Sequence, residues 1–531
     1  MSEVLSCGSL AVASTFLGLV WYRKWRARLA PLPPGPEPWP YVGNIQDLRP
    51  EQLWLTASEW ARKYGCVAYV HVFGQGVVCL NTAEAIDDFI DTCAANRSCI
   101  STSEPSMSPI CSYWRQPPAL HSADRLTEAH DELLLESGAI DLVARIRDSP
   151  DQCFSHIRRY AAKVTLRAAG GVESSEGGGE LASHAEETTI SPLDKMRTGG
   201  GMWDIARHLP ARLLSDDFQR KAVIWRDTVN ELRRRSSEAV KAKITSNASA
   251  SGSAVRSDAR RDGAGEPGIL AANVDLMTAV ISHFALAMLF YPDVMRKAQL
   301  ELDRVLQGRP PRINDKPRLP YTTAIFKESL RWGCPVPLGL LHVPTEELEY
   351  RCARIPRGSI VAANIWNVMR DEAVYPRPYQ FDPERFLVSA ADGPSAANGP
   401  SAASEPDPRP YTFGFERRGR TADLGESACW LVIATILSAF DIVKALDPIT
   451  RHPIDPSIEF ENFVYRIPRE FPVDISPRLA AGIPTVQLAV GQDAITEGAL
   501  PRVLEGGRLR RAFRTTKRVE NWLIQESLVM V

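Results

Sequence analysis

The stretch YPRPYQFDPERF, Tyr375–Phe386, is interrupted by prolines and carries Arg385 near its end. Proline excludes a continuous helix, so we expect this stretch to meander. Upstream, KESLRW (Lys327–Trp332) has helical periodicity, and Glu328 and Arg331 stand three residues apart, which places them on one helix face. Since one carboxylate accepts from two guanidinium groups, a Glu328–Arg331–Arg385 network is expected to lock the meander onto the helix. The alternative is an ordinary solvated ion pair on a helix surface.

Composition indicates an ordinary globular chain. Its 531 residues are 44% hydrophobic and 24% charged, enough for one large core or two domains. The net charge of -2 gives no sign of a nucleic-acid partner. The ten cysteines are scattered, without the spacing of a disulfide framework or a zinc site, so most are interpreted as buried or half-buried thiols.

The N-terminal region predicts a membrane anchor over residues 1–30. Val4–Tyr22 has no charge over 19 residues, and four basic residues follow it directly. This order predicts a single-pass helix with a cytoplasmic body. A cleaved signal peptide is the competing interpretation, but the residues before the apolar stretch include Glu3 and no positive charge. Residues 31–44, rich in proline, are expected to form a stiff hinge.

The remaining chain predicts a mainly helical body with a small sheet. Residues 66–82 have the β-branched pattern of a hairpin, and a second hairpin is expected around Pro356 and Gly358, at positions two and four of a turn. Helical periodicity dominates elsewhere and predicts helices within residues 276–290, 292–306, 322–332 and 427–440.

The expected body covers residues 45–478. Low apolar content and many Gly, Ser and Pro residues predict flexible insertions near residues 169–180, 245–268 and 388–410. The tail, 479–531, continues no pattern of the body.

A further stretch, FGFERRGRTADLGESACW (Phe413–Trp430), has an aromatic-glycine turn, two arginines and the start of an amphipathic helix. This is how a loop presents a buried ligand just before a helix. The loop contains no cysteine or histidine.

Several motifs occur in a specific order: LPPGP, a long helix with a central acid, PDVMRKAQLELDRVL, ESLR, the segment ending in PERF, and FGF…RR…LGESACW. In this order and spacing the chain resembles a membrane-bound cytochrome P-450 of the fungal type, from residue 32 to about 478. The resemblance implies a helix-rich triangular body with a long central helix and small antiparallel sheets. It also implies haem b, electrons from an NADPH-dependent reductase, a lipophilic small-molecule substrate, and attachment to the endoplasmic reticulum membrane.

In this family a cysteine thiolate in the loop binds the haem iron. Counted from Phe413, the cysteine position falls on Arg420, and counted back from the helix it falls on Gly419. The disagreement implies a one-residue deletion, and neither residue can bind iron. Arg417 and Arg418 match the arginines of the family loop and are candidates for haem contact. The nearest thiol, Cys429, is interpreted as helix packing, with a substitute-ligand role as the alternative.

The central helix departs from the family in a second way. AANVDLMTAV resembles the oxygen-activating segment, with Asp275 at the acid position, but Leu276 and Met277 replace two threonines. Asp275 is a possible proton relay. The alternative is a structural role, in which Asp275 is paired with another polar group inside the core of packed helices. Thr278 survives, but it stands three residues after Asp275 instead of one, so its hydroxyl points to a different face from that of a threonine at position 276.

Two haem-contact candidates lie elsewhere. Trp114 resembles the tryptophan of the family's Trp-x-x-x-Arg helix, whose arginine steadies a haem propionate, but Pro118 stands at the arginine position. Arg115 is a possible substitute. His342 resembles a family position beside a propionate.

Three functions therefore remain open from the sequence. The first is a haem-dependent monooxygenase, of the kind found in fungal secondary metabolism. The second is a P-450-fold protein that is catalytically impaired because the axial cysteine is absent; it is then a degenerate gene product, the result of wrongly assigned exon ends, or a binding protein. The third keeps haem through another ligand and performs peroxide or isomerase chemistry.

Overall fold

The computed structural model describes most of the body of the chain. The described residues are 31–40, 42–47, 52–72, 74–96, 126–170, 266–339, 341–344, 346–351, 353–387, 405–413, 420–447, 449–456, 458–462 and 465–478. The expected anchor and the tail 479–531 lie outside them.

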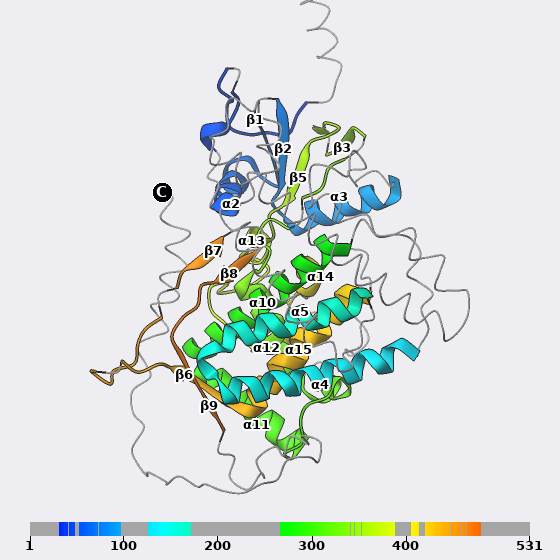
Figure 1. Cartoon of the computed structure of the whole chain (residues 1–531). Helices are drawn as coiled ribbons and strands as arrows, with labels where there is room; N and C mark the ends of the chain where they lie inside the picture. The colour runs from blue at the N-terminus through cyan, green and yellow to red at the C-terminus, as the bar shows by residue number, and fades with distance from the viewer. Residues whose placement is uncertain are drawn as a thin grey trace, which may run out of the picture.

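Helices make up most of the described chain (Figure 1). The longer ones are α2 (Leu53–Tyr64), α3 (Ala83–Asn96), α4 (Leu126–Asp148), α5 (Cys153–Gly170), α10 (Glu266–Phe290), α11 (Pro292–Leu306), α12 (Pro320–Gly333) and α15 (Arg420–Ala439). The shorter ones are α13 (Ile365–Val368) and α14 (Arg409–Phe413), with 3-10 turns η1 (Ile45–Asp47), η5 (Pro150–Gln152), η7 (Ile313–Arg318) and η8 (Pro383–Phe386). The four helices expected from periodicity are confirmed.

Small sheets complete the described fold. One has the order β1-β2-β5, with β1 (Val67–Val72), β2 (Gln75–Leu80) and β5 (Ile360–Ala363). The two-stranded pairs are β3 (Leu348–Tyr350) with β4 (Ala353–Ile355), β6 (Phe440–Lys444) with β9 (Val473–Pro477), and β7 (Phe460–Asn462) with β8 (Arg466–Pro468). The predicted fold class is confirmed, although the β2–β5 pair is parallel rather than antiparallel.

The core is organised around α10. Every residue from Val274 to Phe290 is buried, and a helix that is apolar on all sides belongs in the centre of a large core. Buried residues of α5, α12 and α15 join it in one hydrophobic cluster. Figure 1 shows these helices grouped together, with the β1-β2-β5 sheet at the other end of the molecule.

The first predicted hairpin is confirmed, and the second is wrong. β1 and β2 pair antiparallel from Val67 opposite Leu80 to Val72 opposite Gln75. The turn at Pro356 does form, with the Ser359 amide donating to the Pro356 carbonyl at 3.1 Å and Gly358 at φ 78°. Pro356 and Gly358 therefore occupy positions one and three. The strands on either side join different sheets, because β4 pairs with β3 while β5 pairs with β2.

The proline-rich segment lies against the body. The Tyr69 amide donates to the Pro34 carbonyl and the Arg354 amide to the Pro31 carbonyl, at 2.9 and 2.8 Å. A side chain at Gly35 would place its Cβ 1.8 Å from the Tyr69 carbonyl oxygen, so only glycine fits this approach.

Helices of the described chain border the predicted insertions. Helix α5 continues to Gly170, and α10 already begins at Glu266. In the third insertion, residues from 405 onward are described, and α14 begins at Arg409. Neighbouring helices therefore reach into the polar sequence at these ends. The remaining residues of the three insertions lie outside the described ranges.

Within the described ranges, no single helix is long and apolar enough to cross a membrane. One pair, Val274–Phe290 with Pro292–Leu306, meets the length and composition criteria together and is bent by 108°.

Candidate functional site

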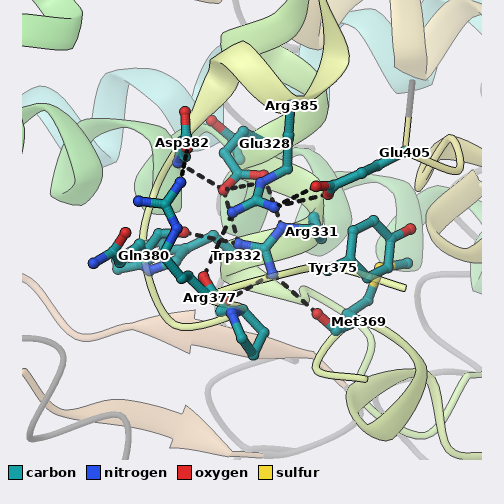
Figure 2. Close-up of polar contacts among 12 residues, drawn as sticks. Glu328, Arg331, Trp332, Met369, Tyr375, Arg377, Gln380, Asp382, Arg385 and Glu405 are labelled. Carbon is teal, nitrogen blue, oxygen red and sulfur yellow. Dashed lines mark hydrogen bonds and ion pairs between the residues drawn. The ribbon is translucent and has the colours of Figure 1, made fainter. Parts of the chain in front are cut away.

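The sequence-predicted network of Glu328, Arg331 and Arg385 is assembled in the structure (Figure 2). Arg331 donates from Nε and Nη2 to the two oxygens of Glu328, at 2.7 and 2.8 Å. Arg385 donates from Nε to Oε1 of Glu328 at 3.3 Å. Glu328 and Arg331 are fully buried, so the alternative of a solvated surface pair is wrong.

The guanidinium group of Arg331 also holds the meander onto α12. Arg331 donates to the carbonyls of Met369, Pro378 and Gln380 at 3.0, 2.7 and 3.0 Å. The Asp382 amide donates to Glu328 Oε1 at 2.9 Å. A buried charge is tolerated when it is paired and its remaining donors are satisfied, and this network meets both conditions. It fixes the loop-rich chain around residues 369–386 onto α12.

Sequence reasoning missed a second carboxylate in this network. Glu405 accepts from Nη1 of Arg385 at 2.9 and 2.7 Å, so Arg385 bridges two acids. Burial raises the pKa of Glu405, and the hydrogen bonds from Arg385 oppose that effect. The Tyr375 hydroxyl also donates to the Pro406 carbonyl at 3.0 Å. These contacts tie the residues just before α14 to the meander, and nothing in the polar sequence before Glu405 indicates such a contact.

Asp275, the candidate proton relay, forms an ion pair across two helices. Its Oδ1 accepts from Nη2 of Arg158 on α5 at 3.0 Å, and both side chains are largely buried. This is the contact expected from the structural interpretation of Asp275. A role as proton relay stays a prediction.

None of the three residues directly after Asp275 has a hydroxyl free of its own helix backbone. Leu276 and Met277 are buried members of the central hydrophobic cluster. The Thr278 hydroxyl donates to the Val274 carbonyl of its own helix at 2.7 Å. A Ser or Thr side chain bonded back to position i−4 in this way serves the helix backbone.

The thiols of the described chain do not fit the role of an iron ligand. Cys429 is fully buried inside α15, and burial raises the pKa of its thiol. Metal ligation requires a thiolate, which this environment disfavours. Cys79, Cys153 and Cys334 are also buried, and Cys66 is half-buried, so the prediction of buried or half-buried thiols is confirmed for these residues.

The described residues also lack a multi-ligand site for a bare metal ion. No group of three or more His, Cys, Asp or Glu side chains in these ranges could hold a metal ion. The described cysteines do not fit a haem-thiolate centre, although the described residues fit the surrounding scaffold. Cys429 packs between helices, as the sequence suggested.

His342 lies where the chain leaves α12 and enters the sheets. Its backbone pairs with Val361, with bonds of 2.8 and 2.7 Å, and its ring lies edge-on to Phe89 at 6.2 Å. Desolvation by the surrounding protein lowers the pKa of His342 to about 4. The imidazole is therefore neutral at pH 7 and carries one N–H, the donor that a contact with a propionate would need. Its haem-contact role stays a prediction.

The lowered pKa of His342 predicts how the free energy of unfolding depends on pH. A histidine held neutral by the fold takes up a proton on unfolding, so stability falls as pH drops from about 6.5 toward 4. His283, fully buried on α10, acts in the same direction, because burial and then Arg466 lower its pKa. We expect His342→Gln to reduce the loss of unfolding free energy between pH 7 and 5, measured by urea titration. The exposed residue His452 provides the control, and an equal slope in His342→Gln and wild type would contradict the assignment.

Two buried arginines from other segments contact the C-terminal end of α12, and the sequence did not predict them. Arg370 donates to the Trp332 carbonyl at 2.8 Å, and Arg466 donates to the Gly333 carbonyl at 3.0 Å. Cations near the last carbonyls of a helix interact favourably with its dipole. Burial lowers the pKa of Arg370 to about 9, while its guanidinium lies over the Trp366 ring at 3.3 Å. These arginines therefore cap the helix that carries Glu328.

The remaining site candidates are not placed by the structure. Trp114 lies outside the described residues, as do Arg417, Arg418 and Gly419. Arg420 is the first residue of α15, one residue after the position that the helix-side count assigns to the missing cysteine.

Comparison with known proteins agrees with this architecture. Residues 267–419 match the family model described as cytochrome P-450. The chain is 30% identical to cytochrome P-450 monooxygenase 208 of Postia placenta, over 90% of this chain and 96% of the relative. It is 29% identical to cytochrome P-450 monooxygenase ple1 of Rhodocybe pseudopiperita, over 86% and 92%. It is also 30% identical to tryptamine 4-monooxygenase of Psilocybe cyanescens, over 88% and 97%. The chain therefore belongs to the cytochrome P-450 family.

Proposed function

We propose that this chain is built for the monooxygenase function of its family, the oxidation of a small lipophilic substrate with O2. The near full-length similarity to named P-450 monooxygenases is the observation that carries this proposal. The buried Glu328–Arg331–Arg385 network supports it, because the scaffold that holds the meander is intact. Haem would supply the oxygen-transfer chemistry when bound.

The finer parts of the function follow from the same family. NADPH-dependent reductase would provide the electrons, and the apolar stretch Val4–Tyr22 would anchor the chain in the endoplasmic reticulum membrane with the body in the cytoplasm. Several relatives come from fungi, which supports a place in fungal secondary metabolism. The tryptamine named for one relative is the substrate of that protein; the class proposed for this chain is a lipophilic small molecule.

A second candidate function is a catalytically impaired member of the family. The observation that favours it is the ligand loop, which has no cysteine or histidine between Phe413 and Ser427. The nearest thiol, that of Cys429, is fully buried in α15. In this case the chain keeps the fold and its capacity for a lipophilic ligand, or its loop reflects wrongly assigned exon ends in the gene.

The absorption spectrum of the reduced, carbon-monoxide-treated protein separates the two candidates. The full-length chain is purified in detergent, its haem content is measured, and the spectrum is recorded. A band of thiolate-ligated haem supports the monooxygenase. Protein that is folded by circular dichroism and free of haem supports the impaired member. Resequencing the transcript across Phe413–Trp430 checks for a lost cysteine codon.

A further inference from the structure

Trp39 is an exception among the tryptophans that the structure describes. Its side chain is 58% exposed, whereas the other tryptophans in the described ranges are between 0 and 6% exposed. Glu37, Pro38 and Pro40 beside it are exposed as well. An indole left in water forgoes the free energy of burying a large aromatic ring. The exposed ring therefore invites a partner, provided that the backbone holds it in place.

The backbone around Trp39 is fixed on the body. The Trp39 and Gly43 amides donate to each other's carbonyls at 3.1 and 3.0 Å, and Gly43 bridges to Val72 of β1. Gly43 has a φ of 72°, and a Cβ at this position would lie 2.1 Å from the His71 carbonyl oxygen, so only glycine fits. Because the turn is already ordered, the ring can bind a partner with little further loss of backbone entropy.

Asn44 fixes the same turn through its side chain. Its side-chain amide donates to the Pro36 carbonyl at 3.1 Å, and its side-chain oxygen accepts from the His71 amide at 3.1 Å. Its own amide donates to the His71 carbonyl at 2.7 Å. Contacts with β1 therefore hold the chain on both sides of the exposed residues 37–40, which project from a rigid base.

The place of this turn along the chain indicates which partner covers the indole. The Pro31 carbonyl accepts from the Arg354 amide at 2.8 Å, so the chain is attached to the body from that point. Residues 23–30 separate Pro31 from the apolar stretch Val4–Tyr22. A segment of this length spans at most about 29 Å when fully extended. With the apolar stretch in a bilayer, the end of the body that carries Trp39 stays close to the membrane surface.

A lipid surface suits a single projecting tryptophan better than a protein partner does. Trp is enriched where hydrocarbon meets water, because its ring is apolar and its N–H is polar. A protein interface would need a contiguous patch around the ring. The other exposed large hydrophobic side chains of the described ranges lie on α4 and α11 and in and after β6, away from β1 (Figure 1): Leu133, Leu300, Val443, Leu446 and Ile449.

We propose that Trp39 inserts into the lipid–water boundary of a phospholipid bilayer and forms a second membrane contact of the body. This contact rests on the anchor of the proposed function, which it deepens. The anchor keeps the chain at the membrane, and the fixed turn sets the orientation of the body, with the β1-β2-β5 end toward the lipid (Figure 1). Neither contact requires haem.

The emission of Trp39 tests this contact. The full-length chain is placed in phosphatidylcholine nanodiscs whose acyl chains are either unmodified or brominated near the headgroup. Bromine quenches rings that lie in lipid, and iodide in the buffer quenches rings that face water. The difference between wild type and Trp39→Phe isolates the emission of Trp39, which is expected to be lost in brominated lipid and protected from iodide. Trp60→Phe is the matched control, because Trp60 is buried in the cluster that packs α2 on β1; its emission should be quenched by neither.

The outcomes separate this contact from the anchor. Trp39 emission that is quenched by iodide and not by brominated lipid would overturn the inference, and so would emission quenched by neither, since protein would then cover the ring. A chain that does not float with phosphatidylcholine vesicles in a density gradient would overturn the proposed anchor as well. Circular dichroism of Trp39→Phe should match wild type. Haem content and the carbon-monoxide spectrum test the monooxygenase function separately.

Discussion

Glu328→Gln is expected to lower the free energy of unfolding by about 3–5 kcal/mol, which is a large part of the stability of a typical domain. The amide has the size of the carboxylate but lacks its charge. It leaves the buried guanidinium of Arg331 without an ion partner and removes one of the two acids that Arg385 bridges. Urea titration followed by circular dichroism measures the loss.

An exposed ion pair provides the control for this variant. Lys297 pairs with Glu384, and both side chains are more than half exposed. We expect Lys297→Met to change stability by less than about 1 kcal/mol, because solvent screens the pair. Equal losses of unfolding free energy in Glu328→Gln and Lys297→Met would show that the buried network stabilises the protein no more than an exposed ion pair does.

Trp430→Ala is expected to cost about 3–5 kcal/mol, through lost burial and the cavity it leaves. Trp430 is fully buried in the middle of α15. Its indole N–H donates to the Thr323 hydroxyl of α12 at 3.1 Å, so the substitution also breaks a polar contact between these helices. A lower midpoint of thermal unfolding is the expected observation.

Trp39→Ala tests whether this effect comes from burial. The Trp39 side chain is 58% exposed, and surface substitutions usually stay within about 0.5 kcal/mol. A loss in Trp39→Ala as large as that in Trp430→Ala would mean that truncating a tryptophan, and not emptying the core, destabilises the protein.

Short-range sequence patterns were sufficient to predict much of the candidate site. Glu328 and Arg331 lie three residues apart on one helix, so their pairing follows from helix geometry alone. Thr278 was expected to point away from the family's threonine position directly after Asp275, and in the structure its hydroxyl donates to the Val274 carbonyl of its own helix. The loss of the cysteine is also visible from the residues themselves.

Contacts between distant segments could not be predicted in the same way. The turn at Pro356 follows from its residues, but the pairing of β5 with β2 brings together strands that are far apart along the chain. Glu405 stands in sequence with the composition of a flexible insertion, yet it binds Arg385. Local composition carries no information about such a partner.

The sequence by itself determined the family, the helical class, the buried acid-arginine pair and the absence of a thiolate in the ligand loop, since each depends on residue type and short spacing. Only the tertiary structure decided that Arg158 pairs with Asp275, that Glu405 completes the network, and that Arg409 pairs with Glu426. These contacts depend on how segments that are distant along the chain pack together. Packing is set by the whole set of buried side chains together, and no single motif encodes it.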